Sequence, residues 1–440
     1  MLAFLPLLPL FFFRASASPA VPRAVRISGR RFINPSTGTP VVLAGPNVVV
    51  KGPPYLPTVD DSPTCQDIVN DVCAAAGNCS SCTTFTAHDV ANLRARGWNA
   101  IRLGVVWAGA QPRDEDALDP AFLLRLHALL NLTDAAGIAV VLDNHGDMVG
   151  GAGCGNGVPA WFSAAAAPAL IGAPLATGFP YNLVPGLDVK DLPGFCGSNE
   201  SAWAAFAGDA NYNLLNSCCK ALNDGGNPGA LGYTTISQAT MDYLITEGPG
   251  RAAFVRYWRL LAQAVAGHAS AVAAELMNEP MTVRRPLAFD TWRAAGEAIN
   301  AVVPDMAVSV MDTGEGVLLP AWVIEIAGGG GFISNATLQW IKSAGTTFYA
   351  WHWYGLPASP TEAVADAEAL GESWGVPTFA TEFGDCGAWD ACAAANVSRL
   401  YWHYSAYCTT GAAFGNRAVP NDTFGACILG WGGGTSAYAC

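Results

Sequence analysis

The chain has 440 residues, and 51% of them are hydrophobic, which is enough apolar material for one large barrel or two ordinary domains. Its formal net charge is −13, with only 22 lysines and arginines and no polybasic run. Binding to the phosphates of nucleic acids requires clustered positive charge. The composition therefore argues against intrinsic disorder and against a nucleic-acid partner.

The N-terminus has the pattern of a secretory signal peptide. An almost uncharged apolar run, Leu2–Phe13, is followed by an Ala-x-Ala cleavage pattern at Ala15 and Ala17. We expect residues 1–17 to be removed and the mature protein to be secreted, or delivered to a lysosome or another endomembrane compartment. No later run of about 18 apolar residues predicts a membrane-spanning helix.

The 13 cysteines fit this export, because disulfides form in oxidising compartments. Cys65, Cys73, Cys79 and Cys82 lie close together and could be taken for a zinc site. The export signal favours disulfides, so we assign no metal. Six Asn-x-Ser/Thr sequons are consistent with a glycoprotein: Asn78, Asn131, Asn199, Asn335, Asn396 and Asn421.

Short apolar or β-branched runs alternate with helical patterns, as in βα units of a parallel sheet. Apolar residues at three- and four-residue spacing predict helices over Pro120–Ala136 and Arg251–His268. The predicted strands are Val41–Val49, Ala100–Trp107, Ala139–His145, Ala273–Glu279, Met306–Asp312, Thr346–Tyr354, Thr378–Gly384 and Ile428–Gly432.

Polar residues gather at the C-terminal ends of these strands, where TIM (β/α)8 barrels hold their active sites. We therefore predict an α/β fold of this type for residues 18–440. The alternative is an open, doubly wound sheet, but no glycine fingerprint follows the first strand. A stretch from about 146 to 250, after the third strand, is much longer than an ordinary βα loop and contains four cysteines. We expect it to be a disulfide-tied insertion that forms a lid or cleft wall.

Two carboxylates each end an apolar run and precede a residue that turns the chain: Glu279 before Pro280, and Glu382 shortly before Gly384. Hydrolysis of a glycoside uses one protonated carboxyl group and one ionised carboxylate, so the two environments must differ. A nearby guanidinium favours the ionised form. Arg102, in the second predicted strand, is the candidate to keep Glu382 ionised. Either glutamate alone could equally be a solvated or salt-bridged side chain.

These motifs, in their order along the chain, resemble glycoside hydrolase family 5, from about Ser28 to Trp431. The matching positions are Arg102, His145, Asn278-Glu279-Pro280, His352-x-Tyr354, Glu382-Phe383-Gly384 and Trp431. The resemblance implies a retaining double displacement that needs no cofactor, with Glu382 as nucleophile and Glu279 as acid/base.

The resemblance also implies how the sugar is held. Asn278 would hydrogen-bond the sugar 2-hydroxyl, and Trp431 would lie beneath the ring that is cleaved. The remaining residues that would line this subsite are His145, His352 and Tyr354. For each histidine, a purely structural hydrogen bond is an equal alternative.

Finer motifs resemble the endoglycoceramidase-like and glucosylceramidase-like branch of the family. They overlap the first three predicted strands and the segments after them, at Asn47–Pro57, Asn99–Pro112 and Leu142–Trp161. The resemblance implies that Lys51 contacts the glycan, although it could be a solvated loop charge, and that Asp143 supports the subsite. The insertion could supply a lipid channel or merely pack beneath a lid, through Trp161, Phe162, Phe179, Tyr181, Leu183 and Phe195.

Two features depart from this branch. Gly146 stands where the branch usually has glutamine, which would remove a sugar contact. Only nine residues follow Trp431, too few for a helix to cover a last strand placed there.

The expected substrates are glycosphingolipids or related β-glucosides, and a glycolipid would bring transient contact with a membrane surface. The alternatives are a cellulase-like endo-β-glucanase and a catalytically inactive barrel that binds glycans or glycolipids. The sequence carries no signature of an oligomeric state.

Overall fold

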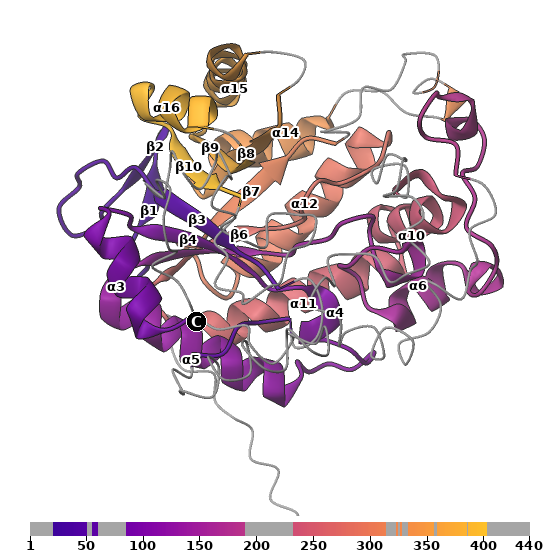
Figure 1. Cartoon of the computed structure of the whole chain (residues 1–440), viewed down its shortest axis with the longest axis horizontal. Helices are drawn as coiled ribbons and strands as arrows, with labels where there is room; N and C mark the ends of the chain where they lie inside the picture. The colour runs from indigo at the N-terminus through magenta and orange to yellow at the C-terminus, as the bar shows by residue number, and fades with distance from the viewer. Residues whose placement is uncertain are drawn as a thin grey trace, which may run out of the picture.

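The computed structural model describes residues 21–50, 55–59, 85–189, 232–313, 323, 326–327, 333–355, 359–384 and 386–402. Its centre is a closed barrel of eight parallel strands in the order β10-β3-β4-β5-β6-β7-β8-β9 (Figure 1). The predicted TIM barrel is therefore confirmed. The strands are β3 (Ala44–Val48), β4 (Ala100–Gly104), β5 (Ala139–Asp143), β6 (Ala271–Glu275), β7 (Ala307–Met311), β8 (Thr347–Trp353), β9 (Thr378–Phe383) and β10 (Ser398–Tyr401).

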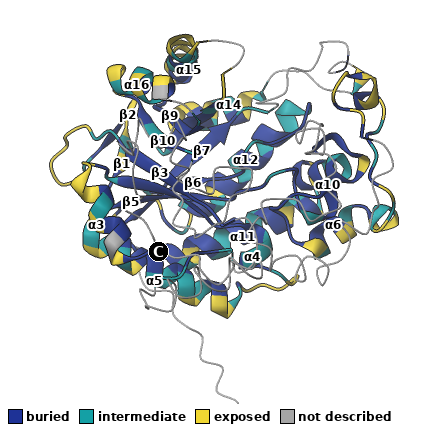
Figure 2. Cartoon of the chain, in the orientation of Figure 1, coloured by how far each residue is buried: buried dark blue, intermediate teal, exposed yellow. Residues whose placement is uncertain are grey.

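Helices surround the barrel and cover its outer face (Figure 1). The strands are consequently buried on both faces, while the outer sides of the helices are exposed (Figure 2). Burial on both faces explains why most of the strands are predominantly apolar rather than alternately polar and apolar. The helices are α3 (Ala87–Ala95), α4 (Trp107–Ala110), α5 (Pro120–Ala136), α6 (Ala160–Ala166), α10 (Thr235–Ile245), α11 (Pro249–Val265), α12 (Arg285–Asn300), α14 (Asn335–Ser343), α15 (Pro360–Trp374) and α16 (Cys386–Ala394).

The ends of α5 show how local sequence fixes an element. The Asp119 side chain accepts hydrogen bonds from two backbone N–H groups of the first turn, and Pro120 occupies the first helical position. Gly137 ends the helix with φ 67°, a left-handed conformation that glycine adopts without strain. The helix predicted over Pro120–Ala136 is confirmed with the same bounds.

The N-terminal end of the barrel is closed by a hairpin that the sequence did not predict. Its strands are β1 (Arg26–Ser28) and β2 (Arg31–Ile33), which pair antiparallel. The ring of Phe32 meets Phe348 at the start of β8 and Phe379 at the start of β9, with ring centroids 5.8 and 5.6 Å apart. The hairpin thus plugs the end of the barrel opposite to the polar strand ends.

The predicted last strand, Ile428–Gly432, was wrong. The barrel is closed by β10, about 30 residues earlier, which pairs with β9 on one side and β3 on the other. Polar residues interrupt the apolar pattern of β10. Burial of Ser398 is tolerated because its Oγ accepts a hydrogen bond from the Leu43 N–H at 3.0 Å. Trp431 lies outside the described residues.

Part of the insertion between β5 and β6 packs as ordinary core. The rings of Trp161 and Phe162 meet Trp107, with centroids 5.8 and 4.8 Å apart. Tyr181 is buried as well, whereas Phe179 is 67% exposed and Leu183 is 55% exposed. The α6 rings of Trp161 and Phe162 therefore support the wall of the barrel.

Several predictions in this region fall on undescribed positions. Three of the four cysteines of the insertion lie outside the described residues, as does Phe195, so its disulfides stay a prediction. The sequon asparagines that the structure describes are all exposed: Asn131, Asn335 and Asn396.

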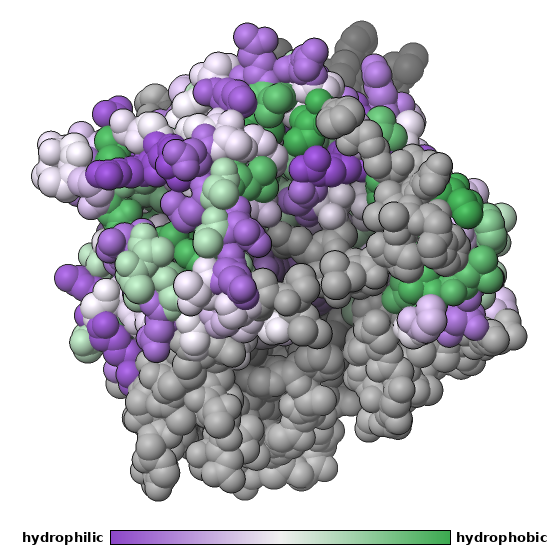
Figure 3. Space-filling model, turned by 90° about the horizontal axis from the view of Figure 1, so that it is seen from above, coloured by the Kyte–Doolittle hydropathy of each residue, from purple (hydrophilic) through white to green (hydrophobic). Residues whose placement is uncertain are grey.

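Hydrophobic and hydrophilic side chains both occur on the face seen in Figure 3. Within the described parts of the chain, no helix has the length and apolar character needed to cross a membrane.

Candidate active site

The candidate site is built around one buried guanidinium at the C-terminal end of the barrel. The Arg102 side chain is fully buried and projects from β4. Its Nη1 donates to Asn47 Oδ1 at 2.8 Å and to Glu382 Oε2 at 2.9 Å, and its Nη2 donates to Asn278 Oδ1 at 2.8 Å. Arg102 therefore ties β3 and β9 to the loop that follows β6.

Two further carboxylates complete the charge around Arg102. Nη2 lies 3.0 Å from Asp143 Oδ1 and 2.7 Å from Glu275 Oε1. Burial would lower the pKa of Arg102, but the charges of Asp143, Glu275 and Glu382 outweigh it and raise that pKa above its ordinary value. Arg102 is thus a permanent cation beside Glu382, and its role in keeping that carboxylate ionised stays a prediction.

Glu382 lies in β9, and each of its oxygens has a different partner. Oε2 accepts from Arg102, and Oε1 accepts from the Tyr354 hydroxyl at 2.5 Å. Desolvation and the charges of Glu382 and Glu279 raise the pKa of Tyr354 well above its ordinary value, so the phenol remains a donor. A Cβ at Gly384 would come within 2.8 Å of the Tyr354 ring, so glycine there gives the ring room to reach Glu382.

Glu279 lies four residues beyond the end of β6, in the following loop rather than in the strand. Its φ of 38° is a left-handed conformation that is unfavourable for a residue with a side chain. Oε1 of Glu279 accepts from Nδ1 of His352, the penultimate residue of β8, at 2.9 Å. The side chain of Glu279 is 26% exposed, so it can reach a bound molecule.

The hydrogen bond between Glu279 and His352 links the pKa values of the two groups. Burial would raise the pKa of Glu279, but the hydrogen bond and the positive charge of His352 lower it. Burial would lower the pKa of His352, but the surrounding carboxylates, with Glu382 first among them, raise it well above the ordinary value. Both shifts favour an ion pair in which His352 is the protonated partner of the 2.9 Å hydrogen bond.

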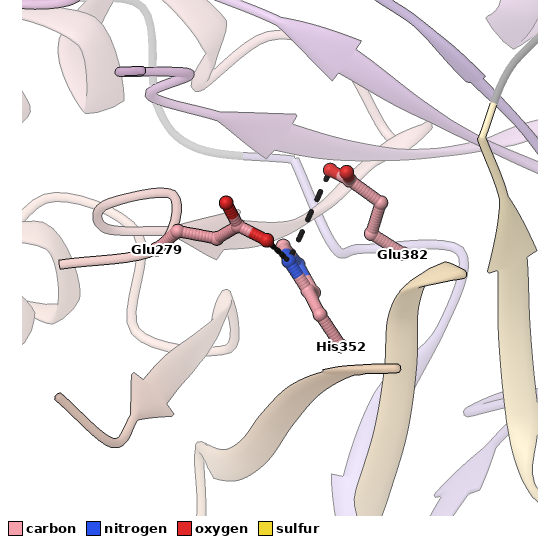
Figure 4. Close-up of side chains that lie close together, drawn as sticks. All are labelled: Glu279, His352 and Glu382. Atoms are coloured by element: carbon pink, nitrogen blue, oxygen red, sulfur yellow. Dashed lines mark hydrogen bonds and ion pairs between the residues drawn. The ribbon is translucent and has the colours of Figure 1, made fainter. Parts of the chain in front are cut away.

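The two glutamates approach His352 from opposite sides (Figure 4). An oxygen of Glu279, an oxygen of Glu382 and a nitrogen of His352 all lie within 4.8 Å of one another. Among the described residues, this is the one set of side chains close enough to be considered as metal ligands. Because His352 and Glu279 already hydrogen-bond each other, and Tyr354 and Arg102 hold Glu382, we assign the set to proton transfer and no metal to it.

A stacked pair borders the site on the side of β5 and β10. Nδ1 of His145 hydrogen-bonds Asp143 at 2.9 Å, and the His145 ring stacks on Trp402 with centroids 5.1 Å apart and planes 12° apart. Trp402 directly follows β10 and therefore takes the strand-end position that the sequence analysis gave to Trp431. Lys51 lies outside the described residues.

The structure brings together the other predicted residues at one end of the barrel: Arg102, Asp143, His145, Asn278, Glu279, His352, Tyr354 and Glu382. Sequence reasoning missed Trp402 and Glu275. Trp402 directly follows β10, whose apolar pattern is interrupted by Ser398 and Arg399, so no strand signal pointed to it. Glu275 carried no signal either, because it lies inside a strand rather than after it.

Two glutamates at the C-terminal end of a barrel, in different electrostatic environments and with one oxygen of each within 4.8 Å of the other, form the kind of carboxylate pair that glycoside hydrolases use. No protein-family model matches this chain. Over 124 residues it is 34% identical to Endoglycoceramidase I from Rhodococcus hoagii (strain 103S), a match that covers 28% of this chain and 20% of that protein. The chain thus spans about a fifth of the curated relative it matches.

Solved structures show the same fold. Endo-glycoceramidase II from Rhodococcus sp., in its complex with ganglioside GM3, aligns over 90% of this chain and 79% of its own, with a TM-score of 0.51 and 17% identity. An endogalactoceramidase aligns over 87% of this chain and 74% of its own, with a TM-score of 0.52 and 16% identity. The chain therefore has endoglycoceramidase-like relatives in both sequence and fold, and the resemblance seen in its motifs is confirmed.

Proposed function

We propose that this protein is a retaining β-glycosidase, with Glu382 as nucleophile and Glu279 as acid/base. One observation carries the proposal: one oxygen of each carboxylate lies within 4.8 Å of the other, and among the described residues a guanidinium binds Glu382 but not Glu279. Retaining enzymes hold their carboxyl groups about 5 to 5.5 Å apart, whereas inverting enzymes need about 6.5 to 9.5 Å to admit a water. So close an approach of two carboxylate oxygens leaves little room for a water between the groups, which favours direct attack by Glu382.

In the first step, an oxygen of Glu382 attacks the anomeric carbon while the bond from that carbon to the aglycone oxygen breaks. Glu279 passes a proton to the departing oxygen, and the proton comes from the pair that Glu279 forms with His352. The products of this step are a free alcohol and a glycosyl ester of Glu382. Tyr354 and Arg102 fix the orientation of the attacking carboxylate.

In the second step, Glu279 accepts a proton from water, and the water oxygen attacks the anomeric carbon on the opposite face. The ester bond to Glu382 breaks and the carboxylate returns to Arg102. Two inversions give net retention. Asn278 supports both steps, because Arg102 fixes its amide oxygen and so turns its amide nitrogen toward the sugar 2-hydroxyl.

For substrate binding, we assign the sugar platform to Trp402 and the subsite wall to His145, with Asp143 holding the histidine ring. The kinship with endoglycoceramidases favours a glycosphingolipid or a related β-glucoside over a cellulose-like chain. Such a substrate fits the export that the N-terminal pattern predicts, and it would bring transient contact with a membrane surface.

The test is to incubate the purified protein with glucosylceramide, a longer glycosphingolipid and a cello-oligosaccharide, each with and without detergent, and to identify released sugars by mass spectrometry. Release from either lipid supports the proposal and shows whether cleavage leaves an intact oligosaccharide. Cleavage of the cello-oligosaccharide alone would assign the protein to the β-glucanases. Binding of a glycolipid without any turnover, by an otherwise folded protein, would indicate a binding role.

A further inference from the structure

A third carboxylate, Glu275, lies behind the two candidate catalytic glutamates as the last residue of β6. Its side chain is fully buried. Nε and Nη2 of Arg102 donate to its two oxygens at 3.1 and 2.7 Å, and the Thr381 hydroxyl donates to Oε1 at 3.3 Å. Nε2 of His352 lies 3.6 Å from the same Oε1. Glu275 is thus held from three neighbouring elements.

The need to balance the positive charge of Arg102 does not explain the presence of Glu275. A buried carboxylate is costly unless charges and hydrogen bonds compensate it. Arg102 already has Asp143 at 3.0 Å and Glu382 at 2.9 Å as acidic partners. Burial raises the pKa of Glu275, but Arg102 and His352 bring it down to about 2, so a full negative charge is kept in the interior.

The two groups that Glu275 contacts lead to the two candidate catalytic residues. Arg102 binds Glu382 through Nη1 at 2.9 Å, and His352 binds Glu279 through Nδ1 at 2.9 Å. Apart from Glu382 itself, Glu275 is the one carboxylate in the described ranges that lies within 4.0 Å of both Arg102 and His352. A movement of Glu275 would therefore disturb both halves of the site together.

We propose that Glu275 is a positioning residue, which fixes the guanidinium of Arg102 and the ring of His352 in the orientations that hold Glu382 and Glu279. The proposal rests on the glycosidase function proposed above. Because Glu275 is fully buried, it acts through these two side chains and does not touch the substrate.

Because Glu275 is charged, its proposed role predicts a change in pH dependence that a purely structural residue would not cause. Removing one negative charge makes proton binding less favourable at every neighbouring acid, so the pKa of each falls. Both limbs of a bell-shaped pH profile should then move to lower pH. Among the described residues, the charged and titratable groups around Glu275 and its two partners include Arg102 from β4, Asp143 from β5, Glu279 after β6, His352 and Tyr354 from β8 and its end, and Glu382 from β9.

The experiment compares the full-length protein with its Glu275→Gln variant, which keeps the size of the side chain and removes its charge. With an aryl β-glucoside, kcat should fall by about tenfold or more, and both pH limbs should move down by about one pH unit. Nuclear magnetic resonance of isotope-labelled histidine should show the pKa of His352 falling by about 1 to 3 units. Asp134→Asn is the matched control, because that carboxylate pairs with His268 at the opposite end of the barrel. It should leave both limbs in place.

A folded Glu275→Gln variant with wild-type kcat and unshifted limbs would overturn the proposal. If this variant does not fold, Glu275→Asp still decides the matter. Aspartate keeps the charge but is one methylene shorter, so the limbs should stay in place while kcat falls, and a wild-type kcat would refute the positioning role. A wild-type protein inactive on every β-glycoside would instead overturn the glycosidase function, while the His352 titration would still report on Glu275.

Discussion

Two hydrogen-bond donors, the positive Arg102 and the neutral Tyr354, hold the two oxygens of the Glu382 carboxylate. Arg102 is a cation at every accessible pH, and the Tyr354 phenol keeps its proton. Together they restrict rotation of the carboxylate without neutralising it by proton transfer. We propose that the carboxylate held in this way is the nucleophile, which attacks the anomeric carbon without having to reorient.

Replacement Glu382→Ala should lower turnover of an aryl β-glucoside by roughly 10⁴-fold or more, because the attacking group is gone. Sodium azide should restore part of the activity by entering the vacated space, and the product should be the α-glycosyl azide. Nuclear magnetic resonance of the product identifies its configuration. Glu279→Ala is the matched control, for which azide should give the β-glycosyl azide. Undiminished activity of Glu382→Ala would refute its role.

The pH profile should show that Glu279 and His352 titrate as one unit. Neighbouring carboxylates raise the pKa of His352 well above its ordinary 6.5, so the wild-type pair keeps its proton beyond that pH. In His352→Gln, Glu279 must hold the proton alone, from an ordinary value of 4.5 that burial raises. The basic limb of kcat/KM should therefore move to lower pH, and kcat should fall by about 10- to 100-fold as a charged hydrogen bond is lost.

His127→Gln is the control for this titration. That histidine pairs with His268 on the outer side of the barrel and should not change the profile. A basic limb of His352→Gln that stays in place, or moves to higher pH, would show that Glu279 alone carries the donated proton in the wild type.

At the scale of elements, seven of the eight barrel strands could be predicted because they are apolar runs buried on both faces. The eighth could not, because β10 has only four residues and includes Ser398 and Arg399. The buried Ser398 satisfies a backbone N–H of the neighbouring segment, a contact that no local pattern reveals. Glu275 was missed for the same reason, because its partners come from β4, β8 and β9 and no local sequence pattern reveals them.

Because the barrel closes with β10 and not with Ile428–Gly432, the proposed sugar platform is Trp402 and not Trp431. In Trp402→Ala, kcat/KM should fall by about 30-fold, corresponding to about 2 kcal/mol of lost contact with the sugar ring. Trp431→Ala should leave it within about twofold. The measurement is steady-state kinetics with an aryl β-glucoside on both folded variants. The reverse ranking would restore Trp431 as the platform and argue against Trp402.

At the scale of the whole molecule, the aromatic cluster around Phe32 and the candidate active site lie at opposite ends of one barrel. Phe32 fills the N-terminal end together with Phe348 and Phe379, whereas the polar groups occupy the C-terminal end. This is the usual division of labour in such barrels. Substitutions at the two ends should therefore have separable effects on unfolding and on turnover.

Replacement Phe32→Ala should lower the free energy of unfolding by about 3 to 5 kcal/mol, because it leaves a cavity in a closely packed aromatic cluster. The kcat of the protein that remains folded should not change. Urea denaturation followed by tryptophan fluorescence measures the first quantity. Leu124→Ala, at a position 74% exposed on α5, is the control and should stay within about 0.5 kcal/mol of the wild type. An equal loss in both variants would contradict the proposed plug.

The central claim is that Glu382 forms a covalent bond with the sugar. The most direct measurement is to trap that intermediate with 2,4-dinitrophenyl 2-deoxy-2-fluoro-β-glucoside, digest the protein and locate the added mass by tandem mass spectrometry. The proposed mechanism predicts time-dependent inactivation and a single fluoroglucosyl label on the peptide that carries Glu382. A label on any other residue, or steady turnover of β-glucosides with no label at all, would contradict it.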